Sequence, residues 1–330
     1  MISLLRQVKS AFLILICFML IACGNDEDRY VIRIGHTLDP THTVHKAMLV
    51  MRDALERESS NSMTIQIYPS GQLGTERELI ELLQIGSLGM TKVSASPLEG
   101  FVPEMKIFNV PYVFNNHEHY LSVLDSDIGI SILQSVQPAR MMGLGYYDAG
   151  SRSFYSTNKP INNPADLLGM KIRVQESQMA MKMVSALGGS PTPIAWGELY
   201  TALQQGVVDG AENNPPSYYL SRHFEVSPYF SIDEHTAVPD VLLISKYVWS
   251  ELSEKQKVWL QKAVDESVVY QRTQWQADTE DALKNVKAAG ASIIQVDKQL
   301  FQDKVSELHE SFVGTDLGEM IARIKEFDRD

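Results

Sequence analysis

Hydrophobic and polar positions in the first part of the chain repeat with two different periods. A period of two predicts strands, and a period near 3.6 predicts helices with one apolar face. The expected strands are residues 30–38, 63–69 and 90–96, and the expected helices between them are residues 45–59 and 75–86. Thr75 and Glu78 have capping-box spacing, and Gly86 suits the C-terminal end of that helix. Strands that alternate with helices predict a mostly parallel sheet.

The second part of the chain repeats this pattern. The segments are GLGYYDAGSRSFYS with its strand-like end, a strand KIRVQ, a helix MAMKMVSALGG and a helix WGELYTALQQG. Residues 78–89 and 198–209 share Glu-Leu, Leu-Gln and Gly at the same spacing. The repeat is weak, but it agrees with two lobes of similar construction.

The third part contains one long helical pattern. Ser253 and Gln256 have capping-box spacing, and neither Pro nor Gly follows until Gly290. About 36 residues at roughly 1.5 Å each span roughly 54 Å, which is longer than one lobe of ~150 residues. Such a helix must kink or lie across both lobes.

The N-terminal residues resemble an export signal. Arg6 and Lys9 precede an apolar run over residues 11–22, which is too short to span a bilayer but suits a signal peptide. The run ends in LIAC, which resembles the lipobox of bacterial lipoproteins, where cleavage precedes a lipidated cysteine. We therefore expect a signal peptide over 1–22, lipidation of Cys23 and a tether over 23–29. The alternative is an ordinary signal peptide with a chance cysteine.

Composition narrows the class of partner. The net charge is −12, and it falls to about −14 without the signal peptide, which disfavours nucleic acid and anionic membrane surfaces. The chain has two cysteines, both within the first 23 residues, so no disulfide is expected beyond them. No second apolar stretch approaches 18 residues. These features indicate an exported, tethered receptor or enzyme whose membrane contact is a lipid anchor.

Candidate ligand-binding residues stand near strand ends, where ligands bind in open α/β sheets. They are His36, Glu76, Arg152, Arg173, Trp196 and Asn213. Arginines bind carboxylates in bidentate fashion, Glu and Asn bond hydroxyl groups, and an indole lies against a sugar ring. The set suits a small hydroxylated carboxylate. Arg173 lies within the strand KIRVQ, where a guanidinium is rarely buried without a partner.

Residues 31–323 resemble the extracytoplasmic solute receptors of tripartite ATP-independent periplasmic (TRAP) transporters, the DctP-type family. The matching motifs are SGQLGTERELIELLQIGSLGM, FNVPYVF, GSRSFYS, LLGMKIRVQES and WGELYTALQQGVVDGAENN. The resemblance implies an α/β, two-lobed periplasmic-binding-protein-like fold with a long helix crossing both lobes. One lobe is expected from residues 30–150 with about 239–278, and the other from 151–238 with about 279–330.

The resemblance also implies a role for each candidate residue. Arg173 corresponds to the arginine that forms a salt bridge with the ligand carboxylate, and Arg152, Glu76, Trp196, Asn213 and His36 occupy further matching positions. Tyr218 and His42 are lesser candidates at the rim of the site. The alternative for Arg173 is an internal salt bridge with Glu176 or Glu212. No cofactor is implied. His36, His42 and His45 lie close in sequence, and His42 and His45 are one helical turn apart, but no clear third ligand stands at metal-site spacing from that pair.

GYYDAGSRSFYS, IRVQES and DGAENNPPSYYLSRHFEV are similar to the receptors of this family that bind hexuronates. The expected function is delivery of glucuronate or galacturonate to TRAP permease subunits. A C4-dicarboxylate or another hydroxy acid is the alternative ligand. A lyase or hydrolase acting on uronates would need a paired acid and base that the sequence does not supply. A receptor that signals to a membrane kinase is a third alternative.

Overall fold

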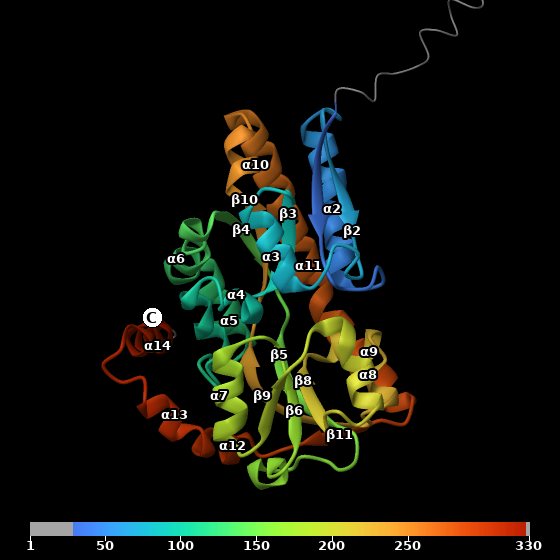
Figure 1. The fold of residues 1–330 in the computed structure, drawn as a ribbon, viewed down its shortest axis with the longest axis vertical. Coiled ribbons are helices and arrows are strands. Elements are labelled where there is room, and N and C mark those ends of the chain that lie inside the picture. The colour runs from blue at the N-terminus through green and yellow to red at the C-terminus, as the bar shows by residue number, and fades with distance from the viewer. Residues whose placement is uncertain (1–28, 328–330) are drawn as a thin grey trace, which may run out of the picture.

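The computed structural model describes residues 29–327, which form two α/β lobes (Figure 1). The expected signal peptide and Cys23 lie outside the described residues. Among the helices of residues 29–327, none is long and apolar enough to cross a membrane.

Lobe I is built on a five-stranded sheet of order β2-β1-β3-β10-β4. Its strands are β1 (Tyr30–Gly35), β2 (Met63–Tyr68), β3 (Met90–Ser94), β4 (Met141–Tyr147) and β10 (Asp240–Ser245). Its helices are α2 (Thr43–Glu58), α3 (Glu76–Gln84), α4 (Ala95–Leu98), η1 (Pro103–Asn109), α5 (His117–Asp125), α6 (Asp127–Gln134), η2 (Gln137–Ala139) and α10 (Lys246–Glu251). The capping box expected at the start of α3 is confirmed, and Gly86 follows its end with φ +77°.

Lobe II is built on a six-stranded sheet of order β11-β9-β5-β8-β6-β7. Its strands are β5 (Ser151–Ser156), β6 (Lys171–Val174), β7 (Ser190–Pro193), β8 (Gly210–Asn213), β9 (Tyr229–Ala237) and β11 (Ser292–Gln295). Its helices are η3 (Pro164–Leu167), α7 (Gln178–Ala186), η4 (Trp196–Glu198), α8 (Leu199–Gln204), α9 (Pro215–Leu220) and η5 (His223–Glu225). A C-terminal segment adds α12 (Lys298–Lys304), α13 (Ser306–Glu310) and α14 (Asp316–Glu326).

Each sheet is parallel except for one strand. That strand is β10 in lobe I and β5 in lobe II, and each pairs antiparallel with both of its neighbours. Both strands enter directly from the other lobe, since β4 leads into β5 through residues 148–150 and β9 leads into β10 through residues 238–239. The mostly parallel α/β fold is confirmed, and its two irregular strands form the connections between the lobes.

The third connection is the long helix α11 (Glu254–Ala288), whose capping box between Ser253 and Gln256 is confirmed. Its 35 residues span about 52 Å. Leu260 and Val264 pack into the core of lobe I, whereas Val286 packs into the core of lobe II. Figure 1 shows the helix running from one lobe to the other, as expected for a helix that crosses both.

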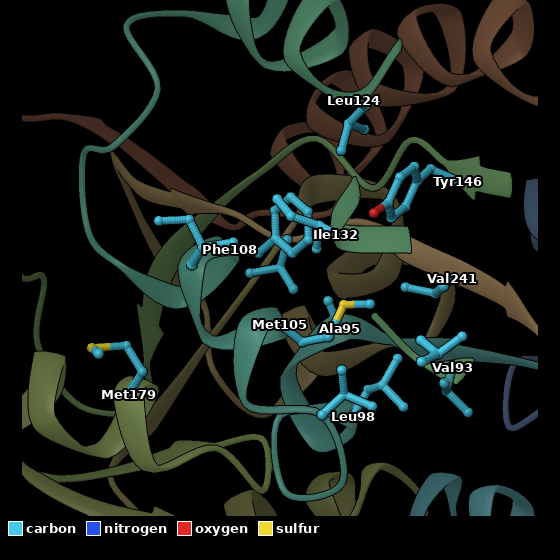
Figure 2. Close-up of a cluster of buried hydrophobic side chains, with 14 of the residues drawn as sticks. Val93, Ala95, Leu98, Met105, Phe108, Leu124, Ile132, Tyr146, Met179 and Val241 are labelled. Atoms are coloured by element: carbon cyan, nitrogen blue, oxygen red, sulfur yellow. The ribbon is translucent and has the colours of Figure 1, made fainter. Parts of the chain in front are cut away.

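Four clusters of buried apolar side chains stabilise the lobes, two in each. Figure 2 shows the cluster of lobe I that contains Phe108 of η1 and Ile132 of α6 together with Val93, Tyr146 and Val241 of the sheet. Met179, from the first turn of α7 in lobe II, belongs to the same cluster. The lobes therefore share apolar contacts beside the strands that connect them.

The C-terminal segment departs from the expected division into lobes. Phe301 of α12 packs into lobe II, but Ile321 and Ile324 of α14 pack into the core of lobe I. The imidazole Nε2 of His119 lies 3.0 Å from the carbonyl oxygen of Ile324. Residues 279–330 were expected to belong to lobe II, and this is wrong for α14, because its apolar face is buried against lobe I.

Candidate ligand-binding site

A cavity of about 430 Å³, partly open to solvent, lies between the lobes. Its walls come largely from the carboxyl ends of β1, β3, β6 and β8, as ligand sites in α/β sheets usually do. The lining residues include Thr37, Leu38, His42, Glu76, Lys92 and Ser94 of lobe I, Arg152, Gln175, Trp196, Asn213, Asn214 and Ser217 of lobe II, and Val238, Asp240 and Trp275 at the connections.

A second compartment of about 310 Å³ adjoins the first and contains Arg173. Glu76, Gln175 and Trp196 line both compartments, so they form a waist between them. We call the compartments the main cavity and the Arg173 compartment. A ligand that spans the waist reaches both.

Arg173 is a buried cation that has no acidic partner among residues 29–327. Its side chain is 1% exposed, and its Nε donates a hydrogen bond to the carbonyl oxygen of Ile194 at 2.9 Å. Its Nη1 is buried and has no hydrogen-bond partner in the described part of the chain. The guanidinium lies 6.0 Å from the Trp196 ring. Burial lowers the pKa of Arg173, which shows how poorly the surroundings compensate its charge. Within residues 29–327 it forms no ion pair, so the alternative pairing with Glu176 or Glu212 does not occur.

Arg152, in contrast, is fully paired inside lobe II. Its Nε forms an ion pair with Glu212, and its Nη2 donates to the Glu212 carbonyl and Oε1 at 2.8 and 2.9 Å. Its Nη1 donates to Oδ1 of Asn213 at 2.9 Å. Burial alone would raise the pKa of Glu212, but Arg152 and His235 together outweigh burial and lower that pKa to about 2. Arg152 therefore lines the cavity and orients Asn213, but its charge is already neutralised.

A histidine on β9 extends this network towards the interlobe connection. Nδ1 of His235 lies 2.8 Å from Oδ2 of Asp233, and its Nε2 lies 3.6 Å from Oε2 of Glu212. Burial disfavours the charged imidazole, yet the two carboxylates outweigh burial and raise the pKa of His235 to about 9. The positive charges of Arg152 and His235 thus neutralise the negative charges of Glu212 and Asp233, and Arg173 takes no part in this network.

On the lobe I side, one lysine holds two carboxylates. Nζ of Lys92 lies 2.9 Å from Oδ1 of Asp240 and 3.3 Å from Oε1 of Glu76, which also accepts a hydrogen bond from the Ser94 amide. Burial raises the pKa of Glu76. Lys92 and Asp240 were not among the residues expected from the sequence, although a lysine within a strand whose five residues are all buried is the same anomaly that identified Arg173.

Two of the expected site residues lie away from the cavity wall. The His36 ring is fully buried, with Nε2 3.0 Å from Nδ1 of His45 and Nδ1 accepting from the Leu38 amide. Its neighbours Thr37 and Leu38 line the cavity instead. Tyr218 was expected at the rim, but it is buried and donates its hydroxyl to the Ser227 carbonyl at 2.7 Å within an aromatic cluster of lobe II.

His42 does line the cavity, where it bridges the lobes. Its Nδ1 caps α2 by accepting from the Val44 amide, and its Nε2 lies 3.4 Å from Oγ of Ser217. Burial lowers the pKa of His42 to about 3, so it stays neutral at physiological pH. The described part of the chain contains no group of three or more potential metal-ligating His, Cys, Asp or Glu residues.

Further contacts across the cleft show that the lobes are closed. Oγ of Ser94 in lobe I donates to Oε1 of Gln175 in lobe II at 3.2 Å. The carboxylate of Glu99, in lobe I, accepts from the Ser177 hydroxyl and from the Met179 amide at 3.2 Å. Glu99 thereby caps the N-terminus of α7 from the opposite lobe, and these bonds must break when the lobes separate.

Comparisons with known proteins agree with this geometry. Residues 34–315 match the family DctP, described as bacterial extracellular solute-binding protein, family 7. Three solved TRAP periplasmic solute-binding proteins are similar to the chain in structure. A Bradyrhizobium protein in complex with galacturonate has 39% identity and a TM-score of 0.87, covering 89% of this chain and 99% of that one.

The second protein, from Anaerococcus prevotii with bound glucuronate, has 34% identity and a TM-score of 0.88, covering 91% of this chain and 99% of that one. The third, from a Polaromonas species and bound to D-erythronate, has 32% identity and a TM-score of 0.87, covering 90% and 98% of the two chains. The ligands of all three are hydroxylated acids with one carboxylate.

Proposed function

The chain belongs to the DctP family of bacterial extracellular solute-binding proteins, and on that premise we propose that it captures a hexuronate and delivers it to a TRAP permease. The ligand, D-galacturonate or D-glucuronate, binds between the lobes and stabilises their closed arrangement. Capture rather than turnover is the function of this family, and the ligands of two similar structures are these uronates.

The observation that carries this proposal is the unpaired charge of Arg173. A buried guanidinium is costly unless a counter-charge and hydrogen bonds compensate it. The protein supplies only the Ile194 carbonyl within the described residues. A ligand carboxylate in the Arg173 compartment completes the missing bonds in bidentate geometry.

The rest of the site favours a ligand with hydroxyl groups over one with a second carboxylate. Arg152 and Lys92, the other cations at the main cavity, are already bound to carboxylates. The same cavity offers Asn213, Asn214 and Ser217, which exchange hydrogen bonds with hydroxyl groups. A C4-dicarboxylate would bring a second negative charge without a free cation to receive it. An aldonate such as D-erythronate is the second candidate, because the similar Polaromonas protein binds it.

A thermal-shift screen of the chain from residue 24 onwards tests the proposal. D-galacturonate, D-glucuronate, D-erythronate, succinate and malate are compared at equal concentration, since a ligand that binds only the native state raises the melting temperature. We expect the largest shift with a hexuronate. A shift with succinate or malate alone would contradict the hexuronate assignment, and a shift with erythronate alone would replace it by an aldonate.

We further propose that Cys23 carries a lipid that holds the receptor at the membrane. The LIAC sequence before Cys23 supports this, and β1 begins at Tyr30, so the tether is short. Metabolic labelling with a palmitate analogue in a host that processes bacterial lipoproteins should label the full chain and not the Cys23→Ala variant. Equal labelling of both, or secretion of an unlabelled wild-type chain, would rule out the anchor.

A further inference from the structure

We propose that Lys92, Asp240 and Glu76 form a subsite that binds the hydroxyl groups at the end of the ligand remote from its carboxylate, and that this subsite excludes a second carboxylate. The proposal rests on the proposed function, because it assigns the part of the same ligand that Arg173 does not hold. We call these three residues the Lys92 triad.

The triad and Arg173 occupy different compartments of the cleft. Lys92 and Asp240 line the main cavity, Arg173 lines its own compartment, and Glu76 stands at the waist between them. A ligand whose carboxylate is held by Arg173 and whose body passes the waist directs its remote end towards Lys92 and Asp240. The Trp196 ring at the waist gives that body an apolar surface.

The triad is held rigidly by three elements of lobe I. Lys92 lies at the centre of β3, Asp240 begins β10 directly after the connection from lobe II, and Glu76 begins α3. These elements lie side by side (Figure 1). The ammonium of Lys92 is fixed between Oδ1 of Asp240 and Oε1 of Glu76, and its side chain is 3% exposed. Side chains fixed in this way are pre-organised to bind a ligand at small entropic cost.

Each carboxylate keeps one oxygen available. Oε1 of Glu76 and Oδ1 of Asp240 contact Lys92, whereas Oε2 and Oδ2 make no hydrogen bond within residues 29–327. Both residues line the cavity. Two free carboxylate oxygens close to one ammonium accept hydrogen bonds from neighbouring hydroxyl groups of a polyhydroxylated ligand.

The charge of the triad explains why it rejects a second carboxylate. One lysine and two ionised carboxylates sum to −1, and the lysine is already shared between its two partners. A neutral hydroxyl donates to this group, but a second ligand carboxylate meets like charge between the two lobes, where repulsion is stronger than in bulk water. The same triad therefore favours the uronate and disfavours the dicarboxylate.

The substitution Asp240→Asn tests the subsite. It keeps the size of the side chain and replaces one acceptor oxygen by an amide, which also removes one negative charge. D-galacturonate and D-glucuronate are titrated into wild type and variant by calorimetry. D-glycerate and succinate are the comparison ligands, because the Arg173 compartment can hold these short acids without hydroxyl contacts at the Lys92 triad. Glu76→Gln is a second variant, which keeps the Lys92–Asp240 pair intact. It tests the subsite independently if Asp240→Asn does not fold.

We expect the variants to bind both uronates at least tenfold more weakly, because a hydrogen bond to a charged group is lost. Binding of D-glycerate should change less than threefold, and succinate should bind equally or more tightly. Asp125→Asn is the matched control, since Asp125 pairs with Arg272 at an exposed position outside the cleft, and its uronate affinity should equal that of wild type.

Two outcomes would overturn the subsite. One is uronate affinity within threefold of wild type in both variants, and the other is an equal loss for uronates and short acids, which would indicate a purely structural role. Failure of wild type to bind any uronate has a different meaning. That result would contradict the proposed function itself, and the wild-type titrations reveal it before any variant is compared.

Discussion

Replacement of Arg173 by methionine should separate the two roles of its charge. In the liganded protein the guanidinium is expected to form two charge-assisted hydrogen bonds with the ligand carboxylate. At about 1.5–3 kcal/mol each, their loss costs about 3–6 kcal/mol, or roughly 10²- to 10⁴-fold in Kd. Methionine keeps a long apolar side chain in the same space, so a cavity contributes little to this loss.

The effect on the unliganded protein should have the opposite sign. Closed lobes without ligand contain an uncompensated buried cation, since Arg173 is 1% exposed and its one hydrogen bond to the described residues runs from Nε to the Ile194 carbonyl. Removing such a charge is neutral or stabilising by up to a few kcal/mol. Unliganded Arg173→Met should therefore unfold at the same temperature as wild type or at a higher one.

Thermal unfolding with and without D-galacturonate measures both effects. Wild type at a ligand concentration of 100 Kd should gain about 2.7 kcal/mol, which raises its melting temperature by several degrees. Arg173→Met should show no such gain at the same concentration. Arg222→Met serves as the control, because Arg222 is exposed and pairs with Glu225 outside the cleft. Uronate binding by Arg173→Met within tenfold of wild type, or an unliganded variant that is clearly less stable than wild type, would contradict the role assigned to this charge.

Three further predictions concern the connections around the site. Gly150→Ala should destabilise the protein by about 1–3 kcal/mol and weaken uronate binding in a calorimetric titration. Gly150 has φ +59° between β4 and β5, and a Cβ there would lie 2.9 Å from Nε1 of Trp275. Gly290→Ala is the control, because Gly290 also has a positive φ of +98° but faces open space, so its uronate affinity should not change. Glu99→Ala should raise the calorimetric Kd of every ligand by the same factor of about 2- to 10-fold, because the bonds of Glu99 to Ser177 and Met179 form between the closed lobes and do not involve the ligand. A factor that differs from ligand to ligand would contradict this. The pKa of His235 rises from 6.5 to about 9 on folding, so its stabilising contribution is complete below pH 6.5 and is lost as the pH rises through 9. In denaturant unfolding, the free energy of unfolding of wild type should fall by about 3 kcal/mol between pH 6.5 and pH 9, and that of His235→Gln should not. Equal pH profiles for the two proteins would exclude the ion pair between His235 and Asp233 as the cause of the fall.

Much of the fold followed from local signals in the sequence. The capping boxes at Thr75 and Ser253 involve residues three apart, and the absence of Pro and Gly before Gly290 predicted the length of α11. The position of α14 could not be predicted in this way. Its amphipathic pattern does not indicate which lobe it contacts, and tertiary packing places Ile324 beside His119 of lobe I.

The candidate site could be predicted where a charged residue stands within a largely buried strand. Arg173 on a buried strand is such a case, and the structure places it in the cleft with no acidic partner in the described part of the chain. Arg152 carried the same signal but is neutralised by Glu212, which lies 60 residues away on a neighbouring strand. The pair of Lys92 and Asp240 is separated by 148 residues, and sequence spacing gives no information on such contacts.

Side-chain direction at the end of a strand was also beyond the sequence. His36 and Thr37 are adjacent, and the first turns into the protein to meet His45 while the second lines the cavity. Successive side chains of a strand point to opposite faces, so an error of one residue selects the wrong face. The chemistry of His36 suggested a ligand contact, but its register directs the ring into the interior of lobe I.

The central claim is that a ligand carboxylate neutralises Arg173, and one pair of ligands tests it most directly. D-galacturonate and D-galactose have the same ring and differ in whether a carboxylate or a hydroxymethyl group is attached to it. Calorimetric titration of the wild-type chain should show binding of D-galacturonate and no detectable binding of D-galactose at the same concentrations. Equal affinity for both sugars would show that the site reads hydroxyl groups alone, and it would contradict the role assigned to Arg173.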